Sequence, residues 1–328
     1  MTTTISAKDV SELRRVSGAG IMDCKDALKE ANGDFDGALD ILRKKGQKVA
    51  AKRADRDAKE GVVVALTNET GNEGIILALS CETDFVAKND QFIASANEIA
   101  QLALDKLPAD ADALLALSMD GQTVAEKLIE QTGKTGEKIE VKDYQRISGD
   151  NLVYYIHAGS KIGVLLSYQS DKDDASQFFR SVAMHIAAMN PSIMTPDQFD
   201  ADFVAKETEA IQAQIKAQNE LNEAENLGKP IKNVPQYVSR LQLTPEVMAK
   251  AEADIKADLK AEGKPEKIWD KIVPGKIERF IADNTLLDQE RCLMSQFFAL
   301  DDTKTVEKAI ADFSADAELI QFKRVAVG

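Results

Sequence analysis

The chain has 328 residues, of which 44% are hydrophobic and 29% are charged. This is enough material for about two folded domains, and it excludes a disordered chain and a collagen-like fibre. The net charge of −14 repels phosphate groups, so we expect no direct binding of nucleic acid. The composition instead favours a protein that binds other proteins.

Neither a membrane protein nor a disulfide-stabilised protein is expected. No apolar run approaches the ~18 residues that a membrane span needs, and residues 1–9 lack the basic and apolar stretches of a signal peptide. We therefore expect a cytoplasmic protein without membrane contact. The 3 cysteines, Cys24, Cys81 and Cys292, are odd in number and widely spaced, which predicts reduced thiols.

The first 46 residues predict three short helices that form a compact bundle. Ser6 and Asp9 have the spacing of an N-terminal cap for the first helix. The apolar pattern is then interrupted by glycines, and Asp34 can cap a third helix that we expect to end at Gly46.

Residues 47–60 are interpreted as a charged linker. Basic residues recur from Lys44 to Lys59 with alanines between them. A phosphate-binding arm is the alternative interpretation. Because no aromatic residue is interleaved for base stacking, a solvated linker or helix is preferred.

An internal repeat follows, which predicts two related α+β core lobes at residues 61–136 and 137–198. Each copy has two β-rich runs joined by a turn signal and followed by an amphipathic helix. These elements are expected at residues 61–67, 75–81 and 92–103 in the first copy, and at 151–157, 161–168 and 178–187 in the second. Residues 138–147 are a candidate further strand of the second lobe.

Residues 199–262 predict two helices, the first over 199–225 and the second starting at Thr244. Pro245 suits the first position of that second helix because its missing N–H is not needed there. Two helices joined in this way suggest an antiparallel helical hairpin that projects from the body.

The segment 263–328 is expected to form a C-terminal segment and module. It contains a short helix near Trp269, a helix over 305–313 and a closing strand over 319–327. The fold class predicted for the whole chain is therefore α+β.

Several patterns that would indicate bound phosphate or metal are incomplete. Gly133-Lys134-Thr135 matches the end of a phosphate-binding loop, but the glycine required five positions earlier is Leu128. His157 and His185 have no carboxylate or thiolate partners at a metal-binding spacing. No metal site, no cofactor and no catalytic residue are predicted.

A cysteine nucleophile is a further alternative. Cys24 lies in a helical segment and Cys81 ends an apolar strand, contexts that favour buried thiols over reactive ones. Such an enzyme ranks behind the protein-binding interpretations.

The segment Thr83-Asp84-Phe85-Val86 follows a strand and precedes a helix, where a chain reversal tends to present side chains to solvent. Periodicity favours a packing role for Phe85. The residues alone leave its exposure undecided.

A series of separated motifs resembles the bacterial elongation factor Ts family, whose members are guanine-nucleotide exchange factors for elongation factor Tu. The motifs extend over nearly the whole chain and occur in the family's order. They are Leu13-Arg14, Met22-Asp23-Cys24-Lys25, Thr83-Asp84-Phe85-Val86-Ala87-Lys88-Asn89, Tyr155-Ile156-His157, Ala183-Met184-His185-Ile186-Ala187 and Gly263-Lys264-Pro265-Glu266.

The resemblance implies an N-terminal bundle similar to a ubiquitin-associated domain, two core lobes, a projecting helical hairpin and a C-terminal module. It implies binding to elongation factor Tu, both GDP-bound and nucleotide-free, and promotion of GDP release without covalent chemistry. The family role of disturbing the partner's magnesium site falls on Thr83, Asp84, Phe85 and Val86. Phe85 would be an exposed wedge, which reverses the packing assignment.

The resemblance also assigns a bundle contact to Leu13, Arg14, Ile21 and Met22, where Ile21 replaces a methionine often found in the family. A core contact falls on His157. The segment 199–262 is longer than the usual family hairpin, with the additional residues around 226–245. Its role, and a homodimer through the core or hairpin, stay open. A translation-associated scaffold or docking protein that does not alter nucleotide exchange is the main alternative function.

Overall fold

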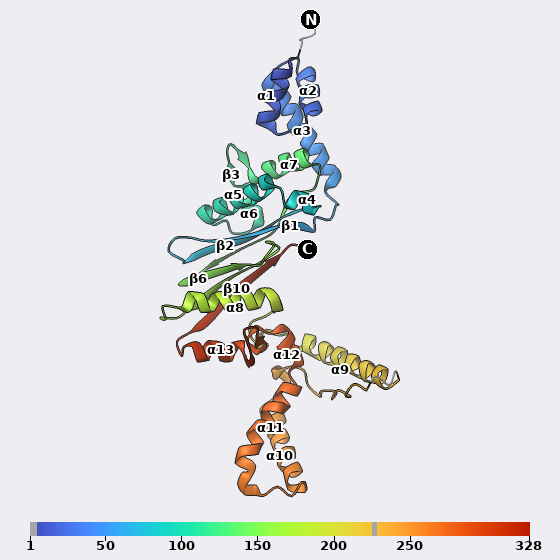
Figure 1. The fold of residues 1–328 in the computed structure, drawn as a ribbon, viewed down its shortest axis with the longest axis vertical. Coiled ribbons are helices and arrows are strands. Elements are labelled where there is room, and N and C mark those ends of the chain that lie inside the picture. The colour runs from blue at the N-terminus through green and yellow to red at the C-terminus, as the bar shows by residue number, and fades with distance from the viewer. Residues whose placement is uncertain (1–4, 225–227) are drawn as a thin grey trace. The chain divides into compact units, whose positions relative to one another are not determined.

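The computed structural model describes residues 5–224 and 228–328. It shows a mixed α+β protein (Figure 1), which confirms the predicted class. The chain divides into two compact units, the first made of residues up to Ala187 together with Ala317–Gly328, and the second of Ala188–Asp316. The second unit is therefore inserted into the sequence of the first.

The first unit begins with the expected three helices, α1 (Ala7–Ser17), α2 (Ile21–Glu30) and α3 (Phe35–Arg53). Ser6 and Asp9 form a capping box at α1, and the Asp34 side chain accepts a hydrogen bond from the Gly37 N–H at the start of α3. Leu13 and Cys24 are fully buried between the helices. Local capping and apolar spacing thus account for the bundle.

The expected end of the third helix at Gly46 is wrong. Helix α3 continues to Arg53, so the first half of the segment interpreted as a linker is helical. Gly46 faces Gly133 of α7 (Val124–Thr135), and a Cβ placed on Gly133 would lie 2.7 Å from the Gly46 Cα. Gly133 therefore permits the close crossing of the two helices, and Gly46 lies inside α3 rather than at its end.

The first core sheet has the antiparallel order β1 (Glu60–Thr67), β2 (Glu73–Cys81) and β5 (Glu140–Ser148). Helix α5 (Asp90–Lys106) packs against this sheet and buries Phe92 and Ile99. The assignment of residues 138–147 to the second lobe is wrong, because β5 pairs with β2 of the first sheet. Strand pairing is a long-range choice that the local pattern does not specify.

The second core sheet has the order β10 (Glu318–Ala326), β7 (Ile162–Gln169) and β6 (Asn151–Ile156), again antiparallel. Helix α8 (Ala175–Met189) stacks Phe179 on Tyr168 of β7, with ring centroids 4.3 Å apart. The predicted closing strand is confirmed as β10. Buried residues from both sheets form one shared apolar layer, so the sheets pack face to face; its members include Val63, Ile76, Leu152, Leu165 and Val325.

Further short elements of the first unit lie between β2 and β5 in sequence. They are α4 (Asp84–Ala87), α6 (Ala111–Ala116), β3 (Ser118–Met119) and β4 (Gln122–Thr123).

The second unit is mainly helical. Its longer helices are α9 (Ala201–Ala224), α10 (Pro245–Ala261), α11 (Trp269–Asp283), α12 (Leu286–Arg291) and α13 (Val306–Phe313). Its shorter elements are η1 (Pro196–Gln198), η2 (Arg240–Gln242), η3 (Glu266–Ile268), η4 (Leu293–Ser295), β8 (Phe297–Phe298) and β9 (Asp301–Thr305). The predicted start of α10 is confirmed, with Thr244 as its cap and Pro245 at its first turn.

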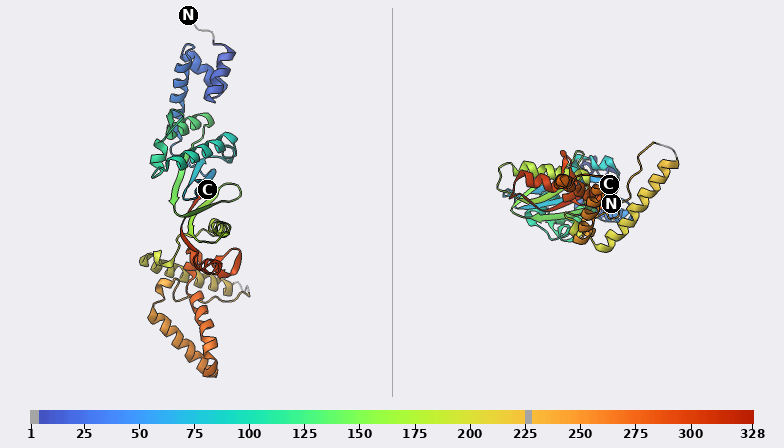
Figure 2. Two further views of the ribbon diagram at one scale, coloured as in Figure 1. Left: turned by 90° about the vertical axis from the view of Figure 1, so that its left-hand side faces the viewer. Right: turned by 90° about the horizontal axis from the view of Figure 1, so that it is seen from below.

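The expected hairpin of residues 199–225 with 244–262 is wrong. Helix α10 instead contacts α11, the helix that follows it in sequence (Figures 1 and 2). Helix α9 is bonded to the extended segment that follows it, since the Asn219 amide exchanges two hydrogen bonds with the Lys232 backbone, at 2.8 and 2.9 Å. The predicted end of the first helix, Glu225, lies outside the described residues. Helix α11 is longer than the short helix expected near Trp269, because it continues past Pro274.

No helix in the described part of the chain is long and apolar enough to cross a membrane.

Candidate functional site

The clearest surface feature is Phe85, which is 84% exposed. It lies on α4, a single helical turn between the end of β2 and the start of α5. On the same turn Ala87 is buried, and Val86 packs against the core under the first sheet. The assignment of Phe85 as a packing residue is therefore wrong, whereas the exposed ring implied by the family resemblance is present.

Thr83, immediately before this turn, is bound to a residue far along the sequence. Its backbone N–H donates to one carboxylate oxygen of Glu137 at 3.0 Å, and its hydroxyl donates to the other at 2.6 Å. The Thr83 carbonyl accepts from the Ala87 N–H at 3.2 Å, which closes the turn. Backbone and side chain are thus both fixed at the base of α4.

Glu82 is held in a similar way. Arg53 of α3 donates to both of its carboxylate oxygens, at 2.9 and 2.7 Å, and the Lys138 backbone N–H donates at 2.7 Å. Burial acts to raise the pKa of Glu82, but the bonds from Lys138 and Arg53 outweigh it and lower that pKa below its ordinary value. Glu82 is accordingly ionised at neutral pH.

Asp84 places a negative charge beside the exposed ring. Its carboxylate pairs with Lys88 at 2.7 Å, and the hydrogen bond from Lys88 lowers the pKa of Asp84. Lys161 is close enough to lower it further, and Lys161 itself pairs with Glu60 at 2.7 Å. Because Glu60 is paired with Cys81 at the end of β2, the turn before β7 lies near α4.

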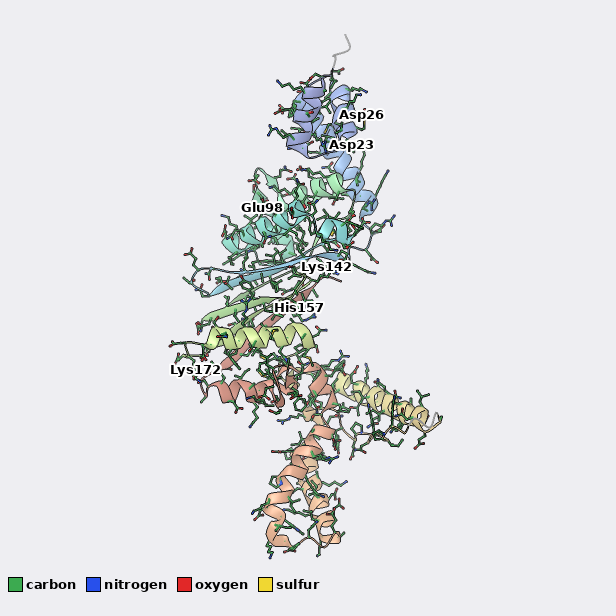
Figure 3. All side chains as sticks on the ribbon, viewed as in Figure 1. Asp23, Asp26, Glu98, Lys142, His157 and Lys172 are labelled. Atoms are coloured by element: carbon green, nitrogen blue, oxygen red, sulfur yellow. The ribbon has the colours of Figure 1, made fainter. Side chains whose placement is uncertain are left out.

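His157 lies in that turn and is exposed, at the end of β6 (Figure 3). Its ring Nδ1 is 3.1 Å from the Tyr155 hydroxyl oxygen. The backbone of the turn is fixed to the neighbouring sheet, since Val63 N–H donates to the Ser160 carbonyl at 2.6 Å. The structure therefore brings His157 and α4 to one end of the core.

The residues assigned to a bundle contact do not all reach the surface. Ile21 and Met22 are 53% and 62% exposed and Arg14 is exposed, but Leu13 is fully buried. Leu13 therefore supports this face from inside. Val16, which is 48% exposed on α1, is an apolar surface residue that the sequence analysis missed.

A groove connects this face of the bundle with the core. It is lined by residues of α1 and α2, including Arg14 and Ile21, and by Gln91 near the start of α5. Since α5 begins three residues after the end of α4, the bundle surface and the turn that carries Phe85 are neighbours in the first unit.

The cysteines do not form a reactive site. All three are free and buried. Burial, with a smaller contribution from the Glu137 charge, raises the pKa of Cys81 to about 12, and burial raises the pKa of Cys292. A thiol with a raised pKa is a poor nucleophile at neutral pH.

The two histidines are placed differently, and neither lies in a recognisable metal site. His157 is exposed and His185 is fully buried on α8. Within residues 5–224 and 228–328, no group of three or more His, Cys, Asp or Glu side chains is arranged to hold a metal ion.

Two groups in this region could not be found from the sequence. Glu137 and Arg53 lie 54 and 29 residues from their partners Thr83 and Glu82. Neither spacing has a local periodicity that would connect the residues.

Comparison with known proteins gives a consistent family. Residues 82–234 and 232–328 match the family model described as Elongation factor TS. A protein named Elongation factor Ts from Rhodopirellula baltica is 67% identical over 326 residues, covering 99% of each chain. Relatives of the same name from Flavobacterium johnsoniae and a Sulfurovum species are 48% and 44% identical, covering 99% and 98% of this chain and 100% and 93% of their own.

Proposed function

Because the chain belongs to the elongation factor Ts family, we propose that it binds GDP-bound elongation factor Tu and promotes GDP release during translation elongation. The observation that carries this proposal is the exposed Phe85 ring on a turn fixed at its base. The reaction makes and breaks no covalent bond. The factor acts by binding, and the nucleotide-free partner is the form that it binds most tightly.

Differential affinity is the physical requirement for this activity. A factor lowers nucleotide affinity only by preferring the nucleotide-free partner, and linkage requires bound nucleotide to weaken the factor by the same ratio. Magnesium neutralises the phosphate charge of the nucleotide. Disturbing the magnesium site of the partner therefore lowers its affinity for GDP.

Phe85 is the proposed wedge. Full burial of a phenylalanine side chain contributes about 1.5–3 kcal/mol, which corresponds to roughly 10- to 100-fold in an equilibrium. This apolar gain can offset the distortion of the partner's magnesium site. Thr83 and Val86 anchor the turn that carries the ring, and the carboxylate of Asp84, the residue before Phe85, pairs with Lys88.

The other proposed contacts are Arg14, Ile21 and Met22 on the bundle and His157 on the core. Several contacts on one chain raise the effective concentration of each for the others. Tight binding therefore does not depend on Phe85 alone. Its removal should slow nucleotide release more than it weakens the complex.

Replacing Phe85 with Ala tests the proposal. We expect GDP release at saturating factor to slow by about tenfold or more, with most complex formation retained. The measurement is release of a fluorescent GDP analogue from purified elongation factor Tu over a range of factor concentrations. Ile231→Ala, which removes an apolar side chain that is 53% exposed, is the control and should leave the rate unchanged.

The same assay separates exchange from simple docking. A scaffold that binds without altering nucleotide exchange predicts equal release rates for the wild type and Phe85→Ala. Equal rates would therefore remove the exchange hypothesis in favour of the scaffold.

Chelation of magnesium gives a second test of the mechanism. If Phe85 acts through the magnesium site, excess EDTA removes the feature that it disturbs. The difference in release rate between the wild type and Phe85→Ala should then shrink to less than about twofold, within the usual scatter of such contributions. A difference that persists in EDTA would show that Phe85 acts elsewhere.

A further inference from the structure

The helical turn that carries Phe85 is too short to hold its own shape. Helix α4 has 4 residues, and an isolated turn of this length is unfavourable because nucleation fixes several residues for few hydrogen bonds. Thr83 occupies its N-cap position, but the side chain makes no capping bond to the helix. The Thr83 hydroxyl donates a hydrogen bond to the Glu137 carboxylate.

The bonds within the turn do not compensate for this. The Asp84–Lys88 ion pair is its main side-chain contact, and the Lys88 side chain is 77% exposed. Solvent-exposed ion pairs of this kind contribute little to the free energy of folding. The geometry of Phe85 is therefore set by contacts with other elements: Val86 and Ala87 pack on the core, and the preceding residues Thr83 and Glu82 are bonded to distant residues.

The polar contacts come from a cluster that we call the turn clamp, composed of Arg53, Glu82 and Glu137. Glu137 uses both carboxylate oxygens on Thr83. Glu82 receives two bonds from Arg53 and one from the Lys138 backbone, which follows Glu137 directly. Charged, paired hydrogen bonds of this kind are stronger and more directional than neutral ones.

The turn clamp also connects α4 with the bundle. Arg53 is the last residue of α3, and α3 is continuous from Phe35. The helix that forms one side of the bundle therefore ends in a direct bond to the residue before Thr83. Both proposed contact regions of the first unit are linked through one rigid element.

We propose that Glu137 and the Arg53–Glu82 ion pair are positioning residues for nucleotide exchange, holding Phe85 in the orientation in which it enters the partner. This inference rests on the proposed function. A turn that is already ordered avoids the cost of fixing the ring on binding. Without the turn clamp the chain still binds, but the wedge is misplaced when the complex forms.

The expected effect is a loss of maximal rate with little loss of affinity. Glu137→Ala should lower the GDP-release rate at saturating factor by up to the roughly tenfold expected for Phe85→Ala, because a misplaced ring loses the contribution that its burial makes. The half-saturating concentration should change by less than about threefold, within the range expected when other contacts supply the affinity. Release of fluorescent GDP from elongation factor Tu, measured with the full-length chain, gives both quantities.

Glu137→Gln serves as the conservative rescue. The amide oxygen can accept from the Thr83 N–H, and the amide nitrogen can donate to the Thr83 hydroxyl, since a hydroxyl both donates and accepts. This variant should recover most of the wild-type rate. A loss equal to that of Glu137→Ala would overturn the positioning role.

Glu126→Ala is the matched control. Glu126 accepts from the N–H and hydroxyl of Thr123, at 2.8 and 3.1 Å, at the start of α7. Glu126→Ala therefore removes the same two kinds of hydrogen bond as Glu137→Ala, one to a threonine N–H and one to its hydroxyl, but at Thr123. Its release rate should equal that of the wild type, and a tenfold loss there would attribute the effect to general destabilisation.

The Phe85→Ala background distinguishes positioning from a merely structural role. If Glu137 acts through the ring, adding Glu137→Ala to Phe85→Ala should slow release no further. Two independent losses that multiply would overturn the inference. Arg53→Ala provides a second variant should Glu137→Ala fold poorly, and the same non-additivity with Phe85→Ala is expected of it.

The outcomes also separate this inference from the proposed function. A wild-type chain that fails to accelerate GDP release overturns the proposed function and this inference together. Wild-type acceleration that is lost in Phe85→Ala but kept in both Glu137→Ala and Arg53→Ala overturns the positioning role alone.

Discussion

The residues next to Phe85 fix the turn that exposes its ring, some by packing on the core and others by hydrogen bonds. Val86 and Ala87 face the core, so the one-turn helix has a fixed inner side and Phe85 points outward. Thr83 and Glu82 are bonded to Glu137 and Arg53 at the base. Covering an exposed apolar side chain with another protein surface lowers the free energy of the system.

The exposure of this residue could not be predicted from periodicity. Phe85 lies in an apolar pair with Val86, and such pairs usually pack inside. Glu82 and Thr83, which precede Phe85, are bonded to Arg53 and Glu137, and these partners lie 29 and 54 positions from them along the chain. The family resemblance supplied the correct expectation because the motif was identified as a unit.

Cys81 should be unreactive in the folded protein. Burial raises its pKa from 9.0 to about 12, so the thiolate fraction at pH 8 falls by about a thousandfold relative to an ordinary thiol. We expect no iodoacetamide adduct on Cys81 after an hour at pH 8, whereas the protein in guanidinium should be labelled at Cys24, Cys81 and Cys292. Mass spectrometry of the digested chain measures this.

The same pKa shift has a consequence for stability. Folding favours the neutral thiol, so the contribution of Cys81 to the free energy of unfolding is fully present below pH 9 and is lost as the pH rises towards about 12.

The labelling experiment has one outcome that would contradict this assignment. Rapid labelling of native Cys81 at pH 8 with loss of activity would support the cysteine-nucleophile alternative instead.

At the scale of single elements, local signals predicted where helices begin. Ser6, Asp34 and Thr244 each accept a hydrogen bond from a backbone N–H in the first turn of their helices. A cap and its partner are only three residues apart, so the sequence contains the whole interaction.

Helix ends and element pairings depended on contacts far along the chain. The sequence predicts a helix end at Gly46, yet this residue is buried against Gly133 where α3 crosses α7. The sequence predicts a strand at residues 138–147 but not its pairing with β2, since the local pattern fits an edge of either sheet. Helix α9 pairs with an extended segment through Asn219, a partnership that no periodicity encodes.

The Gly46–Gly133 crossing predicts opposite effects for two similar substitutions. A Cβ at Gly133 would lie 2.7 Å from the Gly46 Cα, so Gly133→Ala forces α3 and α7 apart. Overpacking of this kind costs about 1–3 kcal/mol. A Cβ at Gly46 would meet nothing closer than the Ile129 carbonyl oxygen at 3.4 Å, and alanine favours a helix over glycine by about 0.5–1 kcal/mol.

Urea unfolding of the two variants measures this difference. Gly133→Ala should lower the unfolding midpoint, and Gly46→Ala should leave it unchanged or raise it. Equal shifts in the same direction would show that the helices are not in close contact at these glycines.

At the scale of the whole molecule, the chain order differs from the spatial order. The second unit interrupts the first between Ala187 and Ala317. β10, near the C-terminus, pairs with β7 of a sheet whose other strand, β6, lies more than 150 residues earlier. Sheet completion must wait for synthesis of the inserted unit, and long-range pairing of this kind is slow.

This connectivity predicts that removing the C-terminus damages the first unit rather than the second. A chain ending at Asp316 lacks β10, which leaves β7 with an unpaired edge and removes Val325 and Val327 from the layer between the sheets. We expect amides of β6 and β7 to lose hydrogen-exchange protection. Amides of α10 and α11 should keep theirs, because these helices pack on each other in the second unit.

Single substitutions refine this last prediction. Val325 is 1% exposed and Ile320 is 38% exposed on the same strand, so Val325→Ala should lower the free energy of unfolding of the first unit by about 2 kcal/mol, from two lost methyl groups and the remaining cavity. Ile320→Ala is the control and should have less than half that effect. The pairing predicts that the amides of β7 stay protected from hydrogen exchange in both variants, since the backbone bonds to β10 remain.

The truncated chain gives the outcome that would contradict this role of β10. If truncation removed hydrogen-exchange protection from α10 and α11 and left β6 and β7 unaffected, β10 would stabilise the second unit instead.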